Sequence, residues 1–200
     1  MNLKQKNTDF LNSGKSAWTG EKVVRYPVVG NPVFLELLEK HRDLLNYDGI
    51  TTFFEGGTYN GNNAADFANV FDKVVTAEID QEMYEISCDN HGNNNKIHFL
   101  HGSATEKLKE YLIQNPDERL VILLDDHVGY DSYIAEELEV IQQHSNTDHI
   151  IIIDDIDKLG LGTYPTKEKI EEIVERFDYK AKIIHDNERN KMLIFKEDVV

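Results

Sequence analysis

An acid followed by closely spaced glycines marks one segment of this sequence. Glu55 is followed by Gly56, Gly57 and Gly61, and Tyr59 lies between the last two glycines. Glycines permit a tight turn and let a ligand lie against bare backbone, and the first turn of a helix offers unpaired amides to an anionic group. The pattern is typical of a loop that binds a nucleotide. Glycines that merely let a strand turn sharply into a helix would give the same pattern, so the loop alone does not decide between the two interpretations.

A second acid lies at the spacing that a nucleotide site requires. Glu78 follows the glycines by about 20 residues, where open α/β nucleotide sites place a carboxylate on the ribose hydroxyls. Asp80 has a simpler explanation, because acids at the start of a helix accept hydrogen bonds from unpaired amides. We therefore predict that Glu78 contacts the ligand and that Asp80 caps a helix.

The elements that would position these residues alternate between strand and helix from residue 50 onward. Apolar strand segments are expected at 51–55, 74–78, 97–100, 120–124 and 149–154, with helices at 63–71, 81–91, 105–114, 132–144 and 167–177. Two further strands, 181–185 and 191–195, are joined by a turn-prone segment and predict a hairpin. The pattern indicates an α/β fold: a Rossmann-like doubly wound sheet of about seven strands, mostly parallel, with an antiparallel strand in the C-terminal hairpin.

The first part of the chain has a different character. Residues 1–26 are polar and show no sustained period, which predicts a flexible N-terminal arm or lid. Residues 27–200 would then form the single folded domain. After Pro32, apolar residues recur at helical spacing and predict an amphipathic helix. These residues are Phe34, Leu35, Leu37, Leu38, Leu44 and Leu45.

Composition excludes several classes of protein. The longest apolar runs are far shorter than the roughly 20 residues of a membrane span, and the polar N-terminus does not resemble a secretory signal, so we expect a cytoplasmic protein without a membrane partner. A formal net charge of -16 repels phosphate backbones, which argues against a nucleic-acid partner. A single cysteine, Cys88, excludes an internal disulfide.

Four motifs between Ile50 and Phe195 resemble the class I S-adenosylmethionine-dependent methyltransferases. The motif Glu55-x-Gly57-x-x-x-Gly61 resembles their cofactor loop, and Glu78 resembles their ribose carboxylate. The segments 101–104 and 123–127 resemble the ends of their third and fourth strands, and the final hairpin distinguishes this family from dehydrogenases. The resemblance implies a site for S-adenosylmethionine. Its implied cofactor-binding residues are Glu55, Gly56, Gly57, Tyr59, Gly61, Glu78, Ile79, Gly102, Ser103, Ala104 and Asp125.

Within this family the sequence is most similar to small O-methyltransferases of the catechol, sugar and natural-product type, several of which use a divalent metal. The resemblance implies Asp125, Asp154 and Asp155 as ligands of Mg²⁺ or another divalent cation. Carboxylates at the ends of neighbouring parallel strands suit such a hard cation. The same acids could instead cap helices or accept hydrogen bonds from loop amides.

The catalytic base of the catechol-type enzymes has no counterpart here. Their lysine, three residues past the first metal acid, is replaced by Val128. His127 is the available substitute, because an imidazole can remove a hydroxyl proton near neutral pH. We therefore predict that His127 and Asp125 are the catalytic residues, acting on a hydroxyl of a small-molecule acceptor.

Other functions fit parts of the sequence. A nicotinamide-dependent oxidoreductase or sugar epimerase would also use a glycine turn and an acid near the second strand, although the glycine spacing departs from the usual rhythm of such enzymes. A non-catalytic member of the same fold would keep the architecture without turnover. The acceptor and the oligomeric state stay undetermined at this level, with a homo-oligomer as one alternative.

Overall fold

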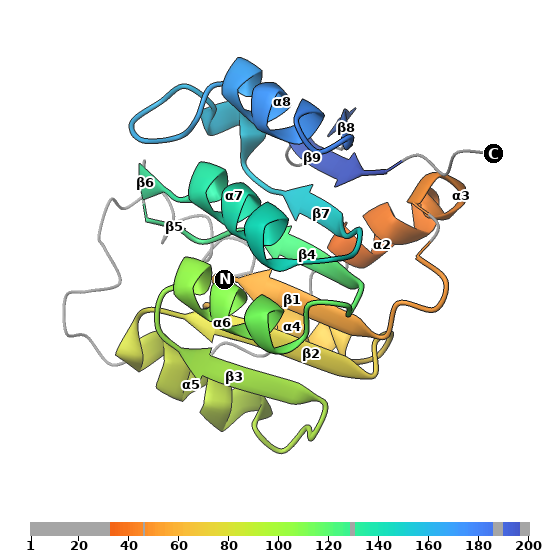
Figure 1. Cartoon of the computed structure of the whole chain (residues 1–200). Coiled ribbons are helices and arrows are strands. Elements are labelled where there is room, and N and C mark those ends of the chain that lie inside the picture. The colour runs from red at the N-terminus through yellow and green to blue at the C-terminus, as the bar shows by residue number, and fades with distance from the viewer. Residues whose placement is uncertain (1–32, 46, 129–130, 186–189, 197–200) are drawn as a thin grey trace, which may run out of the picture.

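The computed structural model describes residues 33–45, 47–128, 131–185 and 190–196. Its strands are β1 (Thr52–Gly56), β2 (Lys73–Glu78), β3 (Ile97–His101), β4 (Leu120–Leu124), β7 (Ile150–Ile153), β8 (Lys180–His185) and β9 (Asn190–Phe195). They form a seven-stranded sheet in the order β3-β2-β1-β4-β7-β9-β8 (Figure 1). The first five strands are parallel, and β9 pairs antiparallel with both β7 and β8. The predicted sheet is confirmed.

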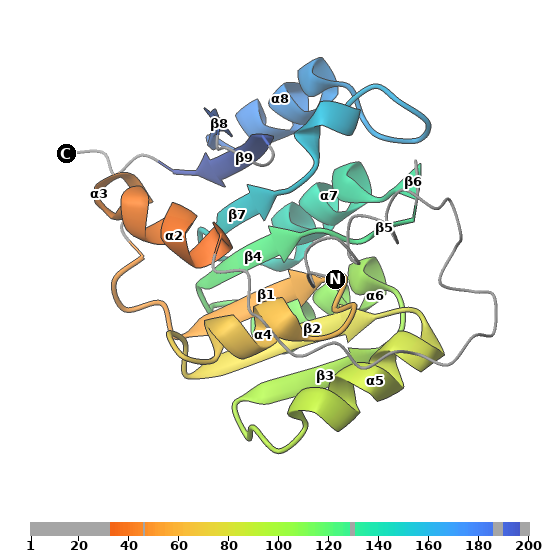
Figure 2. The same cartoon turned by 180° about the vertical axis from the view of Figure 1, so that it is seen from behind.

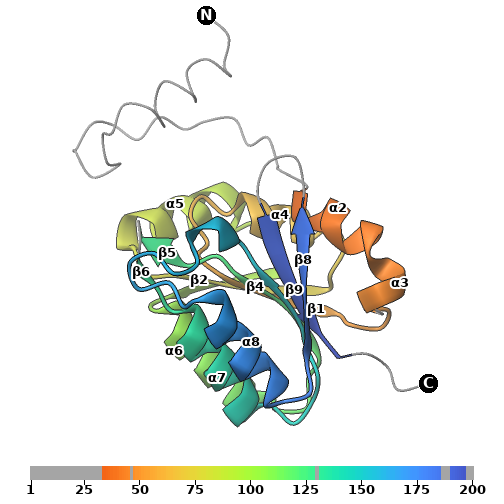
Figure 3. The ribbon, with the colours of Figure 1, turned by 90° about the horizontal axis from the view of Figure 1, so that it is seen from above.

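Helices cover both faces of this sheet (Figure 3). On one face lie α6 (Ala104–Gln114), α7 (Ile134–His144) and α8 (Lys167–Glu175). On the other lie α2 (Val33–Lys40), α3 (Arg42–Leu45), α4 (Asn62–Phe67) and α5 (Gln81–His91), as Figure 2 shows from behind. The described part of the chain contains no helix that is long and apolar enough to cross a membrane.

Neighbouring residues of β1 explain why the central strands are apolar without interruption. Phe53 and Phe54 are fully buried and point to opposite faces, because side chains alternate along a strand. Phe53 stacks on Phe67 of α4 with ring centroids 3.6 Å apart, whereas Phe54 packs in the cluster that contains Leu108 of α6. A parallel strand covered on both faces must bury both sets of side chains.

Three local features differ from the sequence prediction. The single helix expected after Pro32 is divided into α2 and α3. Residues after β4 form a small hairpin of β5 (His127–Val128) and β6 (Asp131–Ser132), so α7 begins at Ile134 rather than at Ser132. The backbone amide of Ser132 is held by the Thr163 hydroxyl at 2.9 Å, which keeps this residue outside the helix. A 3-10 turn, η1 (Ile156–Lys158), follows β7. The predicted arm, residues 1–26, and the domain boundary after it lie outside the described residues.

Candidate active site

The carboxyl ends of the parallel strands bring the predicted site residues to one edge of the sheet. Gly56 at the end of β1 is in register with Ala77 of β2 and with Leu124 of β4. Leu124 is in turn in register with Ile153 of β7. The same edge of the sheet therefore carries the glycine loop, Glu78 and the acids that follow β4 and β7. In open α/β sheets this is the edge at which ligands bind.

At two of the predicted glycines the backbone has a conformation and surroundings that leave no room for a side chain. Gly57 has φ +87°, and a Cβ at this position would lie 2.6 Å from the carbonyl oxygen of Asp125. Gly61 has φ +82°, and its Cβ would lie 2.8 Å from the ring of His91. Both glycines are needed for the turn itself. Evidence for a ligand must therefore come from the side chains around the loop.

Glu78 connects the end of β2 to the glycine loop. Its carboxylate accepts hydrogen bonds from the backbone amide of Tyr59 at 2.8 Å and from that of Asp80 at 2.9 Å. Tyr59 and Ile79, the predicted neighbours of the ligand, are 56% and 63% exposed although both side chains are large and partly or wholly apolar. Glu78 itself is largely buried, and each of its oxygens accepts from one of these amides. The predicted cap is also confirmed, since Asp80 accepts from the amide of Met83 at 2.8 Å.

The segment after β3 closes the same loop from the side. The Gly102 amide donates to the carbonyl of Glu78 at 2.8 Å. Ser103 precedes α6, and Ala104 is buried against the glycine loop, since a Cβ added at Gly56 would lie 3.1 Å from the Ala104 Cβ. Of the predicted residues 102–104, Ala104 therefore lies against the loop and Gly102 against the end of β2.

Glu55, in contrast, lies beneath the loop rather than on its open side. Its side chain is 0% exposed and accepts a hydrogen bond from the Thr76 hydroxyl at 2.6 Å. The Thr58 hydroxyl lies 2.6 Å from that of Thr76 and extends the chain of hydrogen bonds to the loop. Burial raises the pKa of Glu55 to about 8, with the Thr76 hydrogen bond opposing the rise only in part. A buried acid of this kind supports the loop from below.

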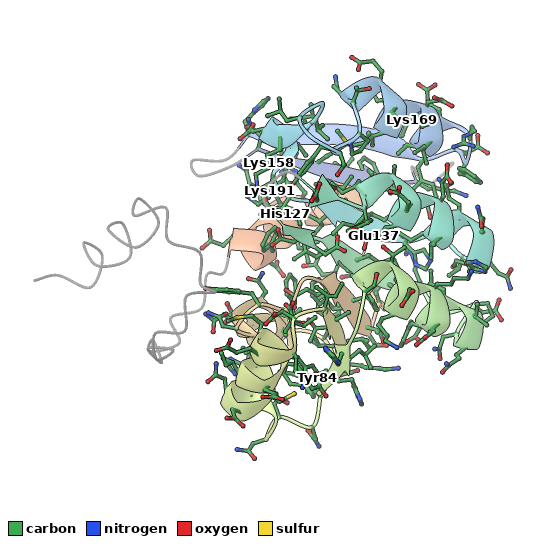
Figure 4. The ribbon with its side chains drawn as sticks, turned by 90° about the vertical axis from the view of Figure 1, so that its left-hand side faces the viewer. Tyr84, His127, Glu137, Lys158, Lys169 and Lys191 are labelled. Atoms are coloured by element: carbon green, nitrogen blue, oxygen red, sulfur yellow. The ribbon has the colours of Figure 1, made fainter. Side chains whose placement is uncertain are left out.

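His127 lies in a cluster of charged side chains after β4 and β7. Its Nδ1 is 3.5 Å from Asp125 Oδ1, and its Nε2 is 3.0 Å from Asp155 Oδ2. Lys158 completes the cluster, with its Nζ 2.7 Å from the same Asp155 oxygen and 2.8 Å from His127 Nε2. Figure 4, which looks onto this edge, shows His127 and Lys158 close together.

A narrow recess adjoins this cluster. It is lined by Leu124, Asp125, Asp126, His127, Ser132, Ile134, Asp154 and Tyr164. The Tyr164 hydroxyl is buried and has no hydrogen-bond partner among the described residues. A buried hydroxyl without a partner is costly, which sets Tyr164 apart from the paired groups around it.

A larger hollow, about 460 Å³, lies at the opposite edge of the sheet and includes Ser145 and Tyr179. The buried His149 beside it accepts from the Leu120 amide at 3.2 Å and is 2.7 Å from the Ser145 hydroxyl. Burial lowers the pKa of His149 to about 4, so this ring is neutral near pH 7. Its hydrogen bonds connect the end of α7 to the sheet, which is a structural role.

Comparisons with known proteins gave structural matches alone. No family model matches the sequence, and no curated protein matches it. The O-methyltransferase TomG from Streptomyces achromogenes, solved with S-adenosylmethionine, has a TM-score of 0.60 at 15% identity, covering 84% of this chain and 82% of that one. An O-methyltransferase from Bacillus cereus, in complex with S-adenosylhomocysteine, has a TM-score of 0.58 at 18% identity over 86% and 84%. An rRNA methylase from Streptococcus thermophilus has a TM-score of 0.54 at 15% identity over 85% and 99%.

The chain has the class I methyltransferase fold. Within that fold, the sheet edge described above corresponds to the edge expected to hold the cofactor. The matches include methyltransferases that differ in their named substrates, so the methyltransferase fold does not by itself identify the acceptor.

The predicted metal ligands are not assembled in this methyltransferase fold. Asp155 faces Lys158 and His127, whereas Asp154 faces Lys191, whose Nζ is 3.7 Å away and whose side chain is 2% exposed. Over the described ranges no group of three or more acidic, histidine or cysteine side chains is arranged to hold a metal. An ammonium group lies against each acid that follows β7. The predicted set of Asp125, Asp154 and Asp155 therefore does not fit a divalent cation.

Two acids lie under the glycine loop: Asp126, which belongs to the motif 123–127, and Glu137, which sequence reasoning missed. Asp126 and Glu137 are neighbours, and a Cβ added at Gly56 would lie within 3.6 Å of both side chains. Burial raises the pKa of Asp126 to about 6. Burial also raises the pKa of Glu137 well above its ordinary value, and the nearby Asp126 carboxyl adds to this rise. A signal for Glu137 was present, because it occupies a position between Ile134 and Ile141 on the buried face of α7.

Lys158 and Lys191 were also missed. Lys158 ends the 3-10 turn η1, three residues after Asp155, whereas Lys191 lies in β9, far along the chain from Asp154. No pattern in the sequence connects either lysine to a motif. Only the fold brings them to the edge that carries His127, as Figure 4 shows.

Proposed function

We propose that this chain binds S-adenosylmethionine and transfers its methyl group to a hydroxyl of a small molecule. The observation that carries the proposal is Glu78, a carboxylate at the end of β2 that also accepts from the loop amide of Tyr59. It lies where a ribose with two hydroxyls would be bound. The bound cofactors of TomG and of the Bacillus cereus enzyme, which share the fold, support the same ligand.

The chemistry requires an acceptor oxygen in line with the sulfonium methyl group. Holding the two reactants together is the main contribution of such a site. His127 is the proposed base: the acceptor hydroxyl gives its proton to the imidazole while the oxygen attacks the methyl carbon. The S–CH₃ bond breaks with its electrons remaining on sulfur, so the positive charge of the cofactor is lost. Asp125 faces the other ring nitrogen and favours the protonated imidazole.

A small acceptor, such as a sugar or a natural product, agrees best with the charge of the chain. The formal net charge of -16 disfavours a polyanion, even though an rRNA methylase shares the fold. We propose cytoplasmic activity on such an acceptor, without a membrane or nucleic-acid partner. No step of this proposal depends on a divalent cation.

Binding calorimetry with S-adenosylmethionine tests the proposal. The wild-type chain is expected to bind the cofactor, and Glu78→Gln is expected to bind it about 10 to 100 times more weakly, because a hydrogen bond to a charged group contributes about 1.5–3 kcal/mol. Glu82→Gln is the matched control, since Glu82 is exposed in the first turn of α5. Turnover is then followed with labelled S-adenosylmethionine and a panel of hydroxylated compounds.

The result that contradicts the proposal is the absence of heat of binding at millimolar cofactor. Binding of NADH in a parallel fluorescence titration would then favour the oxidoreductase alternative. Cofactor binding without turnover on any hydroxylated compound would favour the non-catalytic alternative.

A further inference from the structure

Lys158 lies in the place where the sequence predicts a metal ion. Its Nζ is 2.7 Å from Asp155 Oδ2 and 2.8 Å from His127 Nε2, so it lies against one predicted metal ligand and the predicted base. The side chains of Asp155 and His127 are only 10% and 21% exposed. The ammonium group is therefore part of the site rather than of the open surface.

The local backbone fixes this position. Asp155 has φ +51° and starts the 3-10 turn η1, and the Lys158 amide donates to the Asp155 carbonyl at 2.9 Å. In a 3-10 turn, side chains three residues apart lie above one another. The turn thus directs the lysine back to the acid that precedes it.

We propose that the Lys158 ammonium supplies the positive charge of the acceptor site, in the position predicted for a divalent cation. This inference rests on the proposed methyl transfer. Asp155 needs a cation because it is largely buried, and a divalent ion would need the same carboxylate oxygens that Lys158 contacts. A second positive ion beside the ammonium would also be repelled.

The groups around His127 indicate what the positive charge of Lys158 does. Asp125 faces Nδ1, and Lys158 and Asp155 face Nε2. The Tyr164 ring is the other neighbour, with its centroid 6.0 Å from the His127 ring and 5.8 Å from Lys158 Nζ. The imidazole lines the adjoining recess together with Tyr164, and the Lys158 ammonium lies directly behind it, against His127 Nε2.

In the reaction the acceptor hydroxyl replaces Lys158 as the hydrogen-bond donor to His127 Nε2, its O–H bond breaks and its proton passes to that nitrogen. The oxygen gains negative charge before the new O–CH₃ bond is complete, and the fixed ammonium of Lys158 stabilises that charge. The S–CH₃ bond breaks and leaves a neutral thioether. Lys158 keeps its own protons throughout, so it acts by its charge alone.

The first test needs neither cofactor nor acceptor. Mn²⁺ is titrated into wild-type protein, Lys158→Met and the control Lys169→Met, and free Mn²⁺ is measured by electron paramagnetic resonance. Lys169 pairs only with exposed Glu172 and lies away from the site. We expect tighter Mn²⁺ binding by Lys158→Met alone, because the substitution removes the ammonium group from Asp155 and His127. Equal binding by wild type and Lys158→Met, including none by either, overturns the claim that the lysine occupies a cation site.

The second test measures turnover. Lys158→Met is expected to lower kcat by about 100- to 1,000-fold, the usual effect of removing one group that stabilises a developing oxyanion. The affinity for S-adenosylmethionine should stay unchanged, Lys158→Arg should restore part of kcat, and a chelator should leave wild-type turnover unaffected. Full turnover by Lys158→Met, or its loss from wild type on chelation, overturns the inference. If the wild type binds no cofactor, the proposed function fails, whereas the Mn²⁺ titration still tests the lysine.

Discussion

Replacement of Glu55 by glutamine is expected to remove part of the pH dependence of the free energy of unfolding. Burial raises the pKa of Glu55 from 4.5 to about 8. The unfolded chain releases this proton once the pH passes the lower value, whereas the folded chain keeps it. The folded state therefore binds more protons between these values, and the free energy of unfolding falls as the pH rises. The contribution is complete below the unfolded pKa and is lost as the pH reaches about 8.

The size of the effect follows from the same shift. One pKa unit corresponds to about 1.4 kcal/mol, so raising the pH by about two units within this window should cost about 3 kcal/mol. No discount for solvent screening is needed, because the Glu55 side chain is 0% exposed. Glutamine keeps an oxygen that can accept from the Thr76 hydroxyl, but it has no proton to lose.

Urea unfolding near pH 5.5 and near pH 7.5 measures this difference. Asp126 and Glu137 change stability in the same direction, because burial raises the pKa of both, but they are present in both proteins. The difference between wild type and Glu55→Gln therefore isolates Glu55. Glu106→Gln, on the exposed side of α6, is the control and should follow the wild type. Parallel pH profiles for wild type and Glu55→Gln would refute the reasoning.

Two further predictions concern the same edge of the sheet. Gly57→Ala should lower the free energy of unfolding more than Gly49→Ala does, because both glycines have similar positive φ but only Gly57 would bring its Cβ to 2.6 Å from a backbone oxygen, whereas Gly49 has open space. The left-handed conformation alone costs about 1–2 kcal/mol, so equal losses in thermal unfolding would contradict the predicted clash. Asp80→Ala should cost about 1 kcal/mol of stability through its lost helix cap and leave the affinity for S-adenosylmethionine unchanged. Calorimetry that shows a loss of affinity comparable to that of Glu78→Gln would place Asp80 in the site instead.

The sheet could be predicted from the sequence because its signals are local. Uninterrupted apolar runs such as 120–124 and 150–153 mark strands that are buried on both faces, and the spacing between the glycine loop and Glu78 follows from one strand–helix–strand unit. The Asp80 cap was likewise predictable, since it depends on a bond three residues away. These features need no knowledge of the rest of the chain.

The directions of the charged side chains could not be predicted in this way. The motif treats Asp154 and Asp155 as a pair, but adjacent residues near a strand end point apart, and each meets a different lysine. Lys191 reaches Asp154 only because β9 pairs with β7. Lys158 reaches Asp155 through the positive φ of that aspartate, which sequence gives no reason to expect. The pairing of each aspartate with a lysine therefore argues against a metal site at this edge.

The insertion of β9 between β7 and β8 has a consequence for synthesis on the ribosome. Because β8 is made first but pairs only with β9, it cannot join the sheet by itself. Until β9 emerges, β7 is an edge strand with unpaired backbone groups, and Asp154 lacks the ammonium of Lys191. Such an edge is a template for pairing with other chains. The nascent protein is therefore most vulnerable to aggregation in the interval before β9 is released.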